Sequence, residues 1–360
     1  MPAQTYSYQQ LFDFARSIFL KIGCSDEHAA IATKSLLSAD LRGIDSHGIA
    51  RLSGYVRLWD VKRVNATPDI KVIYETPSTA VVDGDSGLGL VVAPFAMKVA
   101  IEKAKNVGTG WVSVQNSNHF GIAGYHAMLA LEHDMIGMAM TNASPLVAPT
   151  FSIDKMLGTN PIAVAVPAGN EHPFVADLAT TTAANGKLEI LQRKNQDAPL
   201  GWVQDAEGNP STDPHILKKG GALLPLGSDV DHGSHKGYAL GAIVDIFSGL
   251  LSGANYAPWV PPFPAYVPMP KKQPGKGIGH FLGAMRIDAF RPAAEFKSEM
   301  DNWIKGFRGC KTVPGEEKVL VPGDLEIESE AIRLKEGIPL LDPVISDLNE
   351  LGKKLGVPFN

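Results

Sequence analysis

The chain has 360 residues, of which 44% are hydrophobic and 20% are charged, and its formal net charge is -5. This length can bury a sizeable core in one large domain or in two. The negative charge and the lack of a basic run argue against a nucleic-acid partner. No apolar run reaches the ~20 residues that span a bilayer, and Met1–Tyr6 lacks a signal-peptide pattern, so we expect a cytoplasmic protein without a membrane partner. Cys24 and Cys310 are too few and too far apart for a disulfide framework or a CxxC site.

The first part of the chain is mostly helical by its pattern. Ser7 and Gln10 form a capping-box signature before an apolar repeat of helical spacing that ends at Gly23. Ser25 begins a second helix, with acidic residues in the first turn that favour the positive end of the helix dipole. A third helix is predicted over residues 49–59.

From residue 70 onward, short strands mix with helices without strict alternation. This mixture favours an α+β fold with a mixed sheet over a doubly wound parallel sheet. The predicted strands span residues 71–74, 79–83, 110–115, 135–141 and 162–167. The predicted helices span residues 93–105, 239–247, 328–336 and 345–355.

A standard dinucleotide-binding motif is absent from the sequence. No Gly-x-Gly-x-x-Gly follows a predicted strand, and the nearest candidate, Gly275–His280, lacks the last glycine. Residues 257–280 contain seven prolines, which exclude a helix or a central strand there. A plain surface loop is the favoured interpretation, with a flap, a subunit contact or a polyproline recognition motif left as alternatives.

The densest chemistry lies in Ser38–Arg51, where Ser46, His47 and Arg51 follow the end of the second helix. Histidine can accept and return a proton near neutral pH. Arg51, four residues later, would share a helix face with His47, and its planar fork suits a carboxylate. A base beside a carboxylate anchor is what a small 2-hydroxy or 2-keto acid requires. The alternative is a capped helix start with a solvated histidine and arginine.

Further candidates lie in loops. His119 follows a buried-type strand, and Gly121 lets a flat ring or a pyrophosphate approach the backbone, although a loop histidine bonded to backbone is the alternative. Thr159 offers a hydroxyl group near a proline that fixes the chain. Lys236 begins a helical run, where backbone N–H groups also favour a phosphate. The cluster Asp229–His235 lacks a strong third ligand, so we predict no metal site.

Several motifs in one order resemble the type-2 malate/L-lactate dehydrogenase family, and the resemblance covers nearly the whole chain. The matching segments are Asp40–Leu52, Asn116–Tyr125, Leu157–Ala163, Asp177–Thr181, Gly220–Leu226 and His235–Tyr238. The family also includes sulfolactate and ureidoglycolate dehydrogenases. The resemblance implies a nicotinamide cofactor on a non-Rossmann mixed sheet and a homodimer. The expected organisation is a helical domain from residues 1–70 plus about 311–360, and a cofactor-binding α/β domain from residues 71–310.

The resemblance also implies roles for individual residues. His47, Ser46 and Lys187 are the expected catalytic group, and Arg51, Thr159 and His119 the expected substrate contacts. In some relatives His119 is a rival candidate for the base. The expected cofactor contacts are His119, Phe120, Gly121, Asp177, Leu178, Ala179, His235, Lys236, Pro322, Gly323 and Asp324.

Two positions refine the expected chemistry. The piperideine-carboxylate reductase branch carries an aspartate at the position of Lys187, so the lysine argues against an imine reductase and can stabilise the substrate by charge. Asp177 can accept a hydrogen bond from a ribose hydroxyl, which by analogy favours NAD and leaves NADP as the alternative.

We therefore predict a metal-independent oxidoreductase that moves a hydride between a nicotinamide and a 2-hydroxy acid. Malate is the first choice of substrate, because the segments around His47 and His119 and Leu334–Leu340 resemble that branch. Lactate, sulfolactate and ureidoglycolate are the alternatives, as is a catalytically silent member that only binds the cofactor.

Overall fold

The structure is a computed structural model and describes residues 4–359. The helices are α1 (Tyr8–Lys21), α2 (Asp26–Leu41), α3 (Leu52–Asp60), α4 (Gly89–Val107), α5 (Ala123–Met128), α6 (Asn185–Lys194), α7 (Ser234–Asp245), α8 (Ala293–Arg308), α9 (Asp324–Glu336) and α10 (Asp342–Leu355). The strands are β1 (Gln4–Tyr6), β2 (Lys71–Glu75), β3 (Thr79–Asp83), β4 (Thr109–Ser117), β5 (Met135–Thr141), β6 (Ile162–Val166), β7 (Phe174–Leu178), β8 (Val203–Gln204), β9 (Pro210–Ser211), β10 (Ala222–Leu223), β11 (Ile278–Arg286) and β12 (Ile338–Leu340).

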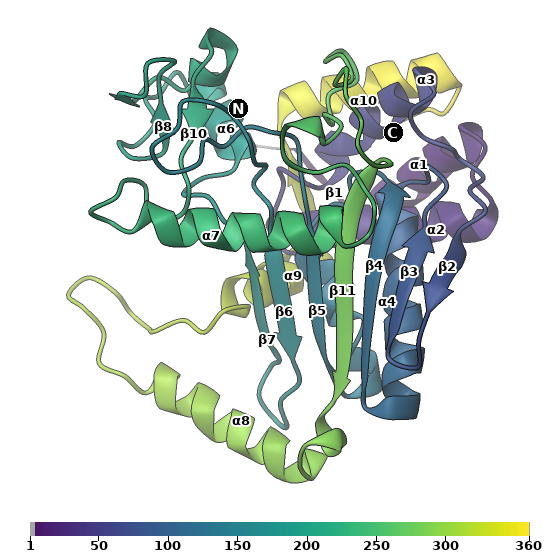
Figure 1. The fold of residues 1–360 in the computed structure, drawn as a ribbon, viewed down its shortest axis with the longest axis vertical. Helices are drawn as coiled ribbons and strands as arrows, with labels where there is room; N and C mark the ends of the chain where they lie inside the picture. Colours follow the sequence, from purple (N-terminus) through teal and green to yellow (C-terminus); the bar gives the residue numbers. More distant parts are fainter. Residues whose placement is uncertain (1–3, 360) are drawn as a thin grey trace.

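A mixed seven-stranded sheet organises the described chain, in the order β2-β3-β4-β11-β5-β6-β7 (Figure 1). The β3–β4 pair is parallel, and every other neighbouring pair in this sheet is antiparallel. β11 lies in the middle, between β4 and β5, although it comes more than a hundred residues after them. The predicted α+β fold with a mixed sheet is confirmed.

One edge of this sheet gathers most of the predicted site segments. In register, Ser117 at the end of β4 pairs with Ile278, and Thr141 at the end of β5 pairs with His280. Ile162, the first residue of β6, pairs with the last residue of β7. The loops that carry His119 and Thr159, and the end of β7 with Asp177, therefore lie at the same edge of the sheet.

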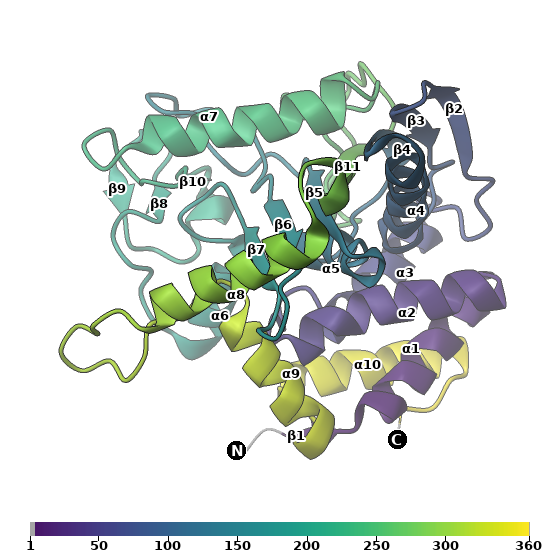
Figure 2. The ribbon, with the colours of Figure 1, turned by 90° about the horizontal axis from the view of Figure 1, so that it is seen from below.

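Helices cover both faces of the sheet. α4 and α5 pack on one face, and α7 with the π-helix Ile246–Leu250 packs on the other. Beyond α4 and α5 lies a layer of α1, α2, α3, α9 and α10 (Figure 2). Its hydrophobic core combines residues from both ends of the described chain, from Tyr6 to Ala66 and from Ile338 to Val357. The domain boundaries near residues 70 and 311 stay a prediction.

The predicted local signals explain how the outer helices begin. The Gln10 backbone N–H donates to Ser7 Oγ at 3.2 Å, and the Ser7 N–H donates back to Gln10 Oε1 at 2.9 Å. Ser25 Oγ likewise accepts from the His28 N–H at 3.2 Å at the start of α2. Within residues 4–359, no helix is both long enough and apolar enough to cross a bilayer.

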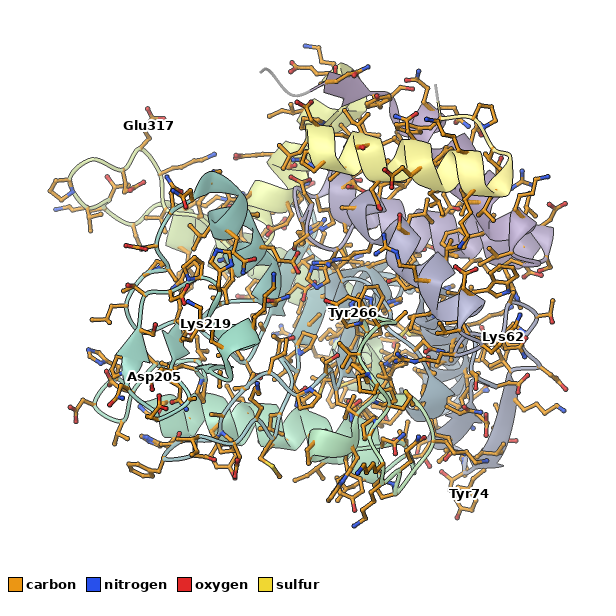
Figure 3. The ribbon with its side chains drawn as sticks, turned by 90° about the horizontal axis from the view of Figure 1, so that it is seen from above. Lys62, Tyr74, Asp205, Lys219, Tyr266 and Glu317 are labelled. Carbon is orange, nitrogen blue, oxygen red and sulfur yellow. The ribbon has the colours of Figure 1, made fainter. Side chains whose placement is uncertain are left out.

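The proline-rich stretch differs from its prediction in two ways. Residues 278–280 belong to the central strand β11, because the last proline is Pro274 and the chain is free to pair after it. The prediction of a plain surface loop is also wrong for Val260–Phe263, since Val260 is only 1% exposed and Phe263 packs on the core of the helical layer. Tyr266, 84% exposed, marks the outer part of the loop in Figure 3.

Candidate active site

The turn between α2 and α3 is held by a buried carboxylate. Asp40 is 1% exposed, and its Oδ2 accepts the Ile49 backbone N–H at 2.6 Å. Burial raises the pKa of Asp40 well above its usual value, while the Ile49 N–H lowers it. A Cβ at Gly48 would lie 2.1 Å from Asp40 Oδ1, so only glycine fits there. From outside, Arg333 of α9 pairs with Asp45. The turn is thus fixed before any ligand arrives.

This turn brings His47 and Arg51 close together, but not on one helix face, because His47 lies in a bend before the 3-10 helix Ile49–Arg51. Ser46 Oγ lies 2.9 Å from His47 Nδ1, and Arg51 Nε donates to the Ser46 carbonyl oxygen at 2.6 Å. Burial, and then the charge of Arg51, lowers the pKa of His47 to about 4. His47 is therefore neutral at pH 7, which is the form that accepts a proton. Arg51 also forms a 3.4 Å ion pair with Glu189 of α6, which leaves its fork without a tight bidentate partner.

His119 lies next to His47, with ring centroids 5.8 Å apart and planes inclined by 20°. Tyr55 Oη is 2.7 Å from His119 Nδ1, and the Gly121 N–H donates to the same nitrogen at 3.4 Å. Gly121 has φ +80°, a conformation that favours glycine. Burial, followed by the charges of neighbouring groups, lowers the pKa of His119 well below its usual value. The structure therefore joins two neutral histidines from segments about seventy residues apart.

The Phe120 side chain packs this loop against the sheet. Its ring lies between His280 of β11, at a centroid distance of 4.7 Å, and His126 of α5, at 4.5 Å. His126 Nε2 donates to the Phe120 carbonyl oxygen at 2.7 Å. Phe120 is 1% exposed, so its side chain belongs to the core, and a cofactor contact from this residue would have to come from its backbone. Its predicted role in cofactor binding stays a prediction.

Of two further predicted cofactor segments, one contacts the start of α5 just after this loop and the other contacts β7. Asp177 Oδ2 accepts the Gly124 N–H at 2.7 Å, and the Val175 N–H donates to the Pro322 carbonyl oxygen at 3.1 Å. Surrounding protein raises the pKa of Asp177 to about 6, against the lowering effects of the Gly124 N–H and Arg42. The Asp177 and Leu178 side chains still reach solvent. An accessible carboxylate beside an apolar side chain, with glycine backbone opposite, fits the sugar and the flat ring of a nicotinamide nucleotide.

The neighbouring predicted residues serve partly structural roles. The Asp324 carboxylate pairs with Arg308 at 2.6 Å and accepts the Val321 N–H at 2.8 Å, while Gly323 at φ +104° precedes α9. Ala179 follows β7 directly and is partly buried. These observations place the segment around Asp324 beside β7 and leave its cofactor contacts as a prediction.

Thr159 and Lys187 lie on two segments with different contacts. The Thr159 carbonyl oxygen accepts the Thr180 N–H at 2.9 Å, which ties the residues before β6 to those after β7. Gly186 packs on Ser46, since a Cβ there would lie 2.7 Å from Ser46 Cβ. The next residue, Lys187, is exposed, and its ammonium lies 5.7 Å from the Trp202 ring centroid. Its catalytic role stays a prediction.

His235 and Lys236 occupy the exposed first turn of α7. The same helix packs through Gly237 on Leu226, whose N–H donates to the Thr180 carbonyl oxygen at 3.0 Å. These contacts connect the start of α7 to the end of β7. In the Asp229–His235 cluster, His232 Nδ1 lies 2.7 Å from Asp229 Oδ1. Among residues 4–359, no three His, Cys, Asp or Glu side chains are grouped to hold a metal ion.

Sequence reasoning missed two residues that contact the histidines. Tyr55 is fully buried in α3, and its aromatic character and helical spacing predict only a core position. Phe263 comes from the proline-rich loop, and its ring centroid lies 4.6 Å from His119 and 5.3 Å from Tyr55. The one available signal was that Tyr55 lies four residues after Arg51, on the same helix face.

Comparison with known proteins identifies the family of this chain. A family profile described as Malate/L-lactate dehydrogenase matches residues 6–349. The chain belongs to this family. It is 43% identical over 349 residues to the malate dehydrogenase of Pyrococcus horikoshii, covering 97% of this chain and 94% of that protein. It is 39% identical to the malate/(S)-sulfolactate dehydrogenase of Methanothermus fervidus, covering 95% of this chain and 96% of that protein.

The solved structure of malate dehydrogenase from Entamoeba histolytica has a TM-score of 0.92 with this chain at 35% identity, covering 99% of both chains. The predicted family is thus confirmed, and the protein is a dehydrogenase of the malate/L-lactate dehydrogenase family. The geometry of the site bears on its substrate and its cofactor preference.

Proposed function

We propose that this dehydrogenase interconverts malate and oxaloacetate, with His47 as the proton acceptor and Arg51 as the carboxylate anchor. The observation that carries the proposal is the single rigid turn that sets a neutral histidine beside an arginine without a tight partner. Both relatives named above carry malate in their names. NAD, rather than NADP, is the proposed cofactor, because the accessible Asp177 carboxylate suits a ribose hydroxyl and repels a 2′-phosphate.

Arg51, His47 and Ser46 have different proposed roles, which follow from their charges and hydrogen bonds. The Arg51 guanidinium holds the substrate carboxylate, in place of its long ion pair with Glu189. A bound carboxylate offsets the arginine charge that lowers the pKa of His47, so substrate binding itself makes His47 a stronger base. Ser46 orients the ring through Nδ1, which leaves Nε2 to take the hydroxyl proton.

The cofactor segments complete the proposed site. The loop around Gly121 and Gly124, Asp177 with Leu178, and the start of α9 would hold a nicotinamide nucleotide, and His235 with Lys236 would meet its phosphates. When bound, the nicotinamide supplies the hydride acceptor or donor. Protein groups supply placement and charge. A homodimer, a cytoplasmic location and independence from metal remain predictions.

A substrate panel tests this proposal. Oxaloacetate, pyruvate, sulfopyruvate and oxalurate are each offered with NADH and with NADPH, and absorbance at the nicotinamide band is followed. We expect the highest kcat/KM for oxaloacetate with NADH. A higher value for another keto acid would replace malate as the substrate. Fluorescence titration with NADH, without turnover of any keto acid, would identify a silent cofactor-binding member.

A further inference from the structure

We infer that Tyr55 is a positioning residue that fixes His119 as a hydrogen-bond donor, so that His119 stabilises the oxygen on the substrate C2 atom while His47 alone acts as the base. The inference rests on the proposed function. It assigns different roles to two histidines that lie side by side and that composition or spacing alone would not distinguish.

The tautomer of His119 follows from its two neighbours. A backbone N–H can only donate, so the Gly121 N–H at 3.4 Å requires a lone pair on His119 Nδ1. The Tyr55 hydroxyl group lies 2.7 Å from the same nitrogen. Burial raises the pKa of Tyr55, so the phenol keeps its proton and can donate it to the lone pair that the Gly121 N–H requires on Nδ1. With two donors on Nδ1, the proton of the neutral ring must reside on Nε2.

The surroundings keep His119 neutral and oriented. The lowered pKa of the ring opposes a second proton, and Phe263 packs on both the imidazole and Tyr55. A Cβ at Gly54 would lie 2.7 Å from Phe263 Cζ, so the glycine admits this phenylalanine to the α3 surface. The Phe263 N–H donates to Ser144 Oγ at 3.0 Å, which anchors the proline-rich loop at this point.

His47 differs in the one property that matters for a base. Its Nδ1 partner is the Ser46 hydroxyl group, which can donate or accept, so His47 can gain and lose a proton while keeping that hydrogen bond. His119 has no such freedom, because its Nδ1 already accepts from fixed donors. Among the described residues, Nε2 of neither ring bonds to protein, so both nitrogens remain available to a ligand.

The chemistry that follows needs no additional reactant. During reduction of a keto acid, negative charge develops on the C2 oxygen as the hydride arrives at C2. The His119 Nε2–H donates a hydrogen bond to that oxygen and keeps its proton, while protonated His47 transfers its proton to the same oxygen. In the oxidation direction His47 removes that proton, and the His119 hydrogen bond stabilises the alkoxide.

Substitution of His119 separates a donor from a base. Glutamine places an N–H group near the Nε2 position but cannot accept a proton, whereas leucine offers neither. We expect His119→Gln to keep kcat within about tenfold of wild type, and His119→Leu to lose about a hundredfold or more, as for loss of one oxyanion donor. If both variants lose activity equally, His119 is not acting as a donor, and the inference is overturned.

Tyr55→Phe then tests the positioning role in two backgrounds. We expect kcat to fall about tenfold in the wild-type background, with KM little changed, because one hydrogen bond is lost. In the His119→Gln background the same substitution should have no effect, since no ring tautomer remains to be fixed. A structural role for Tyr55 would instead reduce kcat equally in both backgrounds. Tyr6→Phe is the matched control, a buried tyrosine on β1 that packs on Phe359.

A spectroscopic readout keeps this inference independent of turnover. Protein labelled with ¹⁵N-histidine should show an unprotonated Nδ1 and a protonated Nε2 for His119, assigned by the signals lost in His119→Gln. Tyr55→Phe should shift these signals toward a mixture of tautomers, and Tyr6→Phe should not. A protonated Nδ1 in the wild type would refute the inference. Lack of turnover with every keto acid, by contrast, would refute only the proposed function.

Discussion

The two halves of the active site are held by different kinds of force. Hydrogen bonds and charges fix the His47 turn: the Asp40 carboxylate accepts the Ile49 N–H at 2.6 Å, and Arg333 pairs with Asp45. Packed rings contribute more to the His119 loop, where Phe120 lies between His126 of α5 and His280 of β11, together with hydrogen bonds from Tyr55 and His126. The proposed proton acceptor, His47, thus lies on a turn held by hydrogen bonds and an ion pair, whereas the proposed donor, His119, lies in a loop held largely by packed rings.

This difference shows how two adjacent imidazoles acquire separate chemistry. Arg51 lies beside His47, so ligand charge can change the pKa of that histidine. The His119 loop is supported by rings whose histidines carry no charge at neutral pH, since burial lowers the pKa of His126 to about 4 and that of His280 to about 3. The pKa of His47 can therefore change when a charged substrate binds, whereas the surroundings of His119 keep the same charge.

The largest expected effect comes from removing the acceptor on the charged side. His47→Ala should lower kcat by about a hundredfold or more, with the affinity for NADH little changed, as expected for loss of general acid–base catalysis. Steady-state kinetics and fluorescence titration measure the two quantities. His133→Ala, at an exposed histidine, is the control. Near-normal turnover of His47→Ala, together with an inactive His119→Ala, would reverse the two roles.

The next largest effect is expected at Arg51, the proposed carboxylate anchor. Arg51→Lys should raise KM for the keto acid by about tenfold, because lysine cannot reproduce the bidentate fork. The melting temperature should change little, since Arg51 is partly exposed and its ion pair with Glu189 is long. Arg57→Lys, which alters an exposed ion pair with Asp347, is the matched control. A lowered melting temperature with an unchanged KM would mean that Arg51 only supports the turn through the Ser46 carbonyl oxygen.

The His47 half could be predicted from the sequence because its parts are local. Ser46, His47 and Arg51 lie within six residues, and a helix end followed by a short turn brings them together whatever the rest of the chain does. The caps of α1 and α2 were predictable for the same reason. Glu189 was not, because it reaches Arg51 from a helix more than a hundred residues away.

The His119 half depends on β11, which the sequence did not indicate. The segment Ile278–Arg286 follows seven prolines and contains Gly279 and Gly283, which are typical of a loop. In the fold, a Cβ at Gly279 would lie 1.8 Å from the Ser248 carbonyl oxygen, and one at Gly283 would lie 2.3 Å from the Trp111 ring. These glycines permit close packing on a strand that is buried along most of its length. The sequence therefore lacks the alternation of apolar and polar residues that marks a half-exposed strand.

α8 was missed for a related reason. This helix has an amphipathic pattern, but few of its residues are buried, and it lies at the lower edge of the molecule in Figure 1. Its clearest tie is Asp301, whose carboxylate accepts the backbone N–H groups of Gly169, Asn170 and Glu171 at 2.8 to 3.1 Å. That contact joins two segments over a hundred residues apart, and local spacing carries no sign of it.

The smallest expected effect at neutral pH is that of substituting His280, beneath the His119 loop. The test is how the stability of the fold changes as pH falls. Both ring nitrogens of His280 face hydroxyl groups, Ser117 Oγ and Thr141 Oγ1, each at 2.7 Å. The pKa of His280 in the folded protein is about 3, below the ordinary value of 6.5. Between pH 6.5 and about pH 3, this histidine is therefore protonated in the unfolded chain but neutral in the folded one. The stability that His280 contributes is therefore complete above pH ~6.5 and is lost as pH falls toward about 3.

A single melting curve cannot isolate this contribution, because Asp177 acts in the opposite direction. Its pKa in the fold is raised to about 6, so the fold gains relative stability as pH falls through that value. The informative quantity is the gap in melting temperature between wild type and His280→Gln. Glutamine should cost stability at pH 7 but cannot take up a proton, so the gap should narrow steadily between about pH 6.5 and about pH 4. The gap for the exposed control His133→Gln should stay constant over the same range. If the His280→Gln gap stayed constant or widened on acidification, the folded protein would already accept a proton at His280, and the apolar half of the site would be as responsive to charge as the half that carries His47.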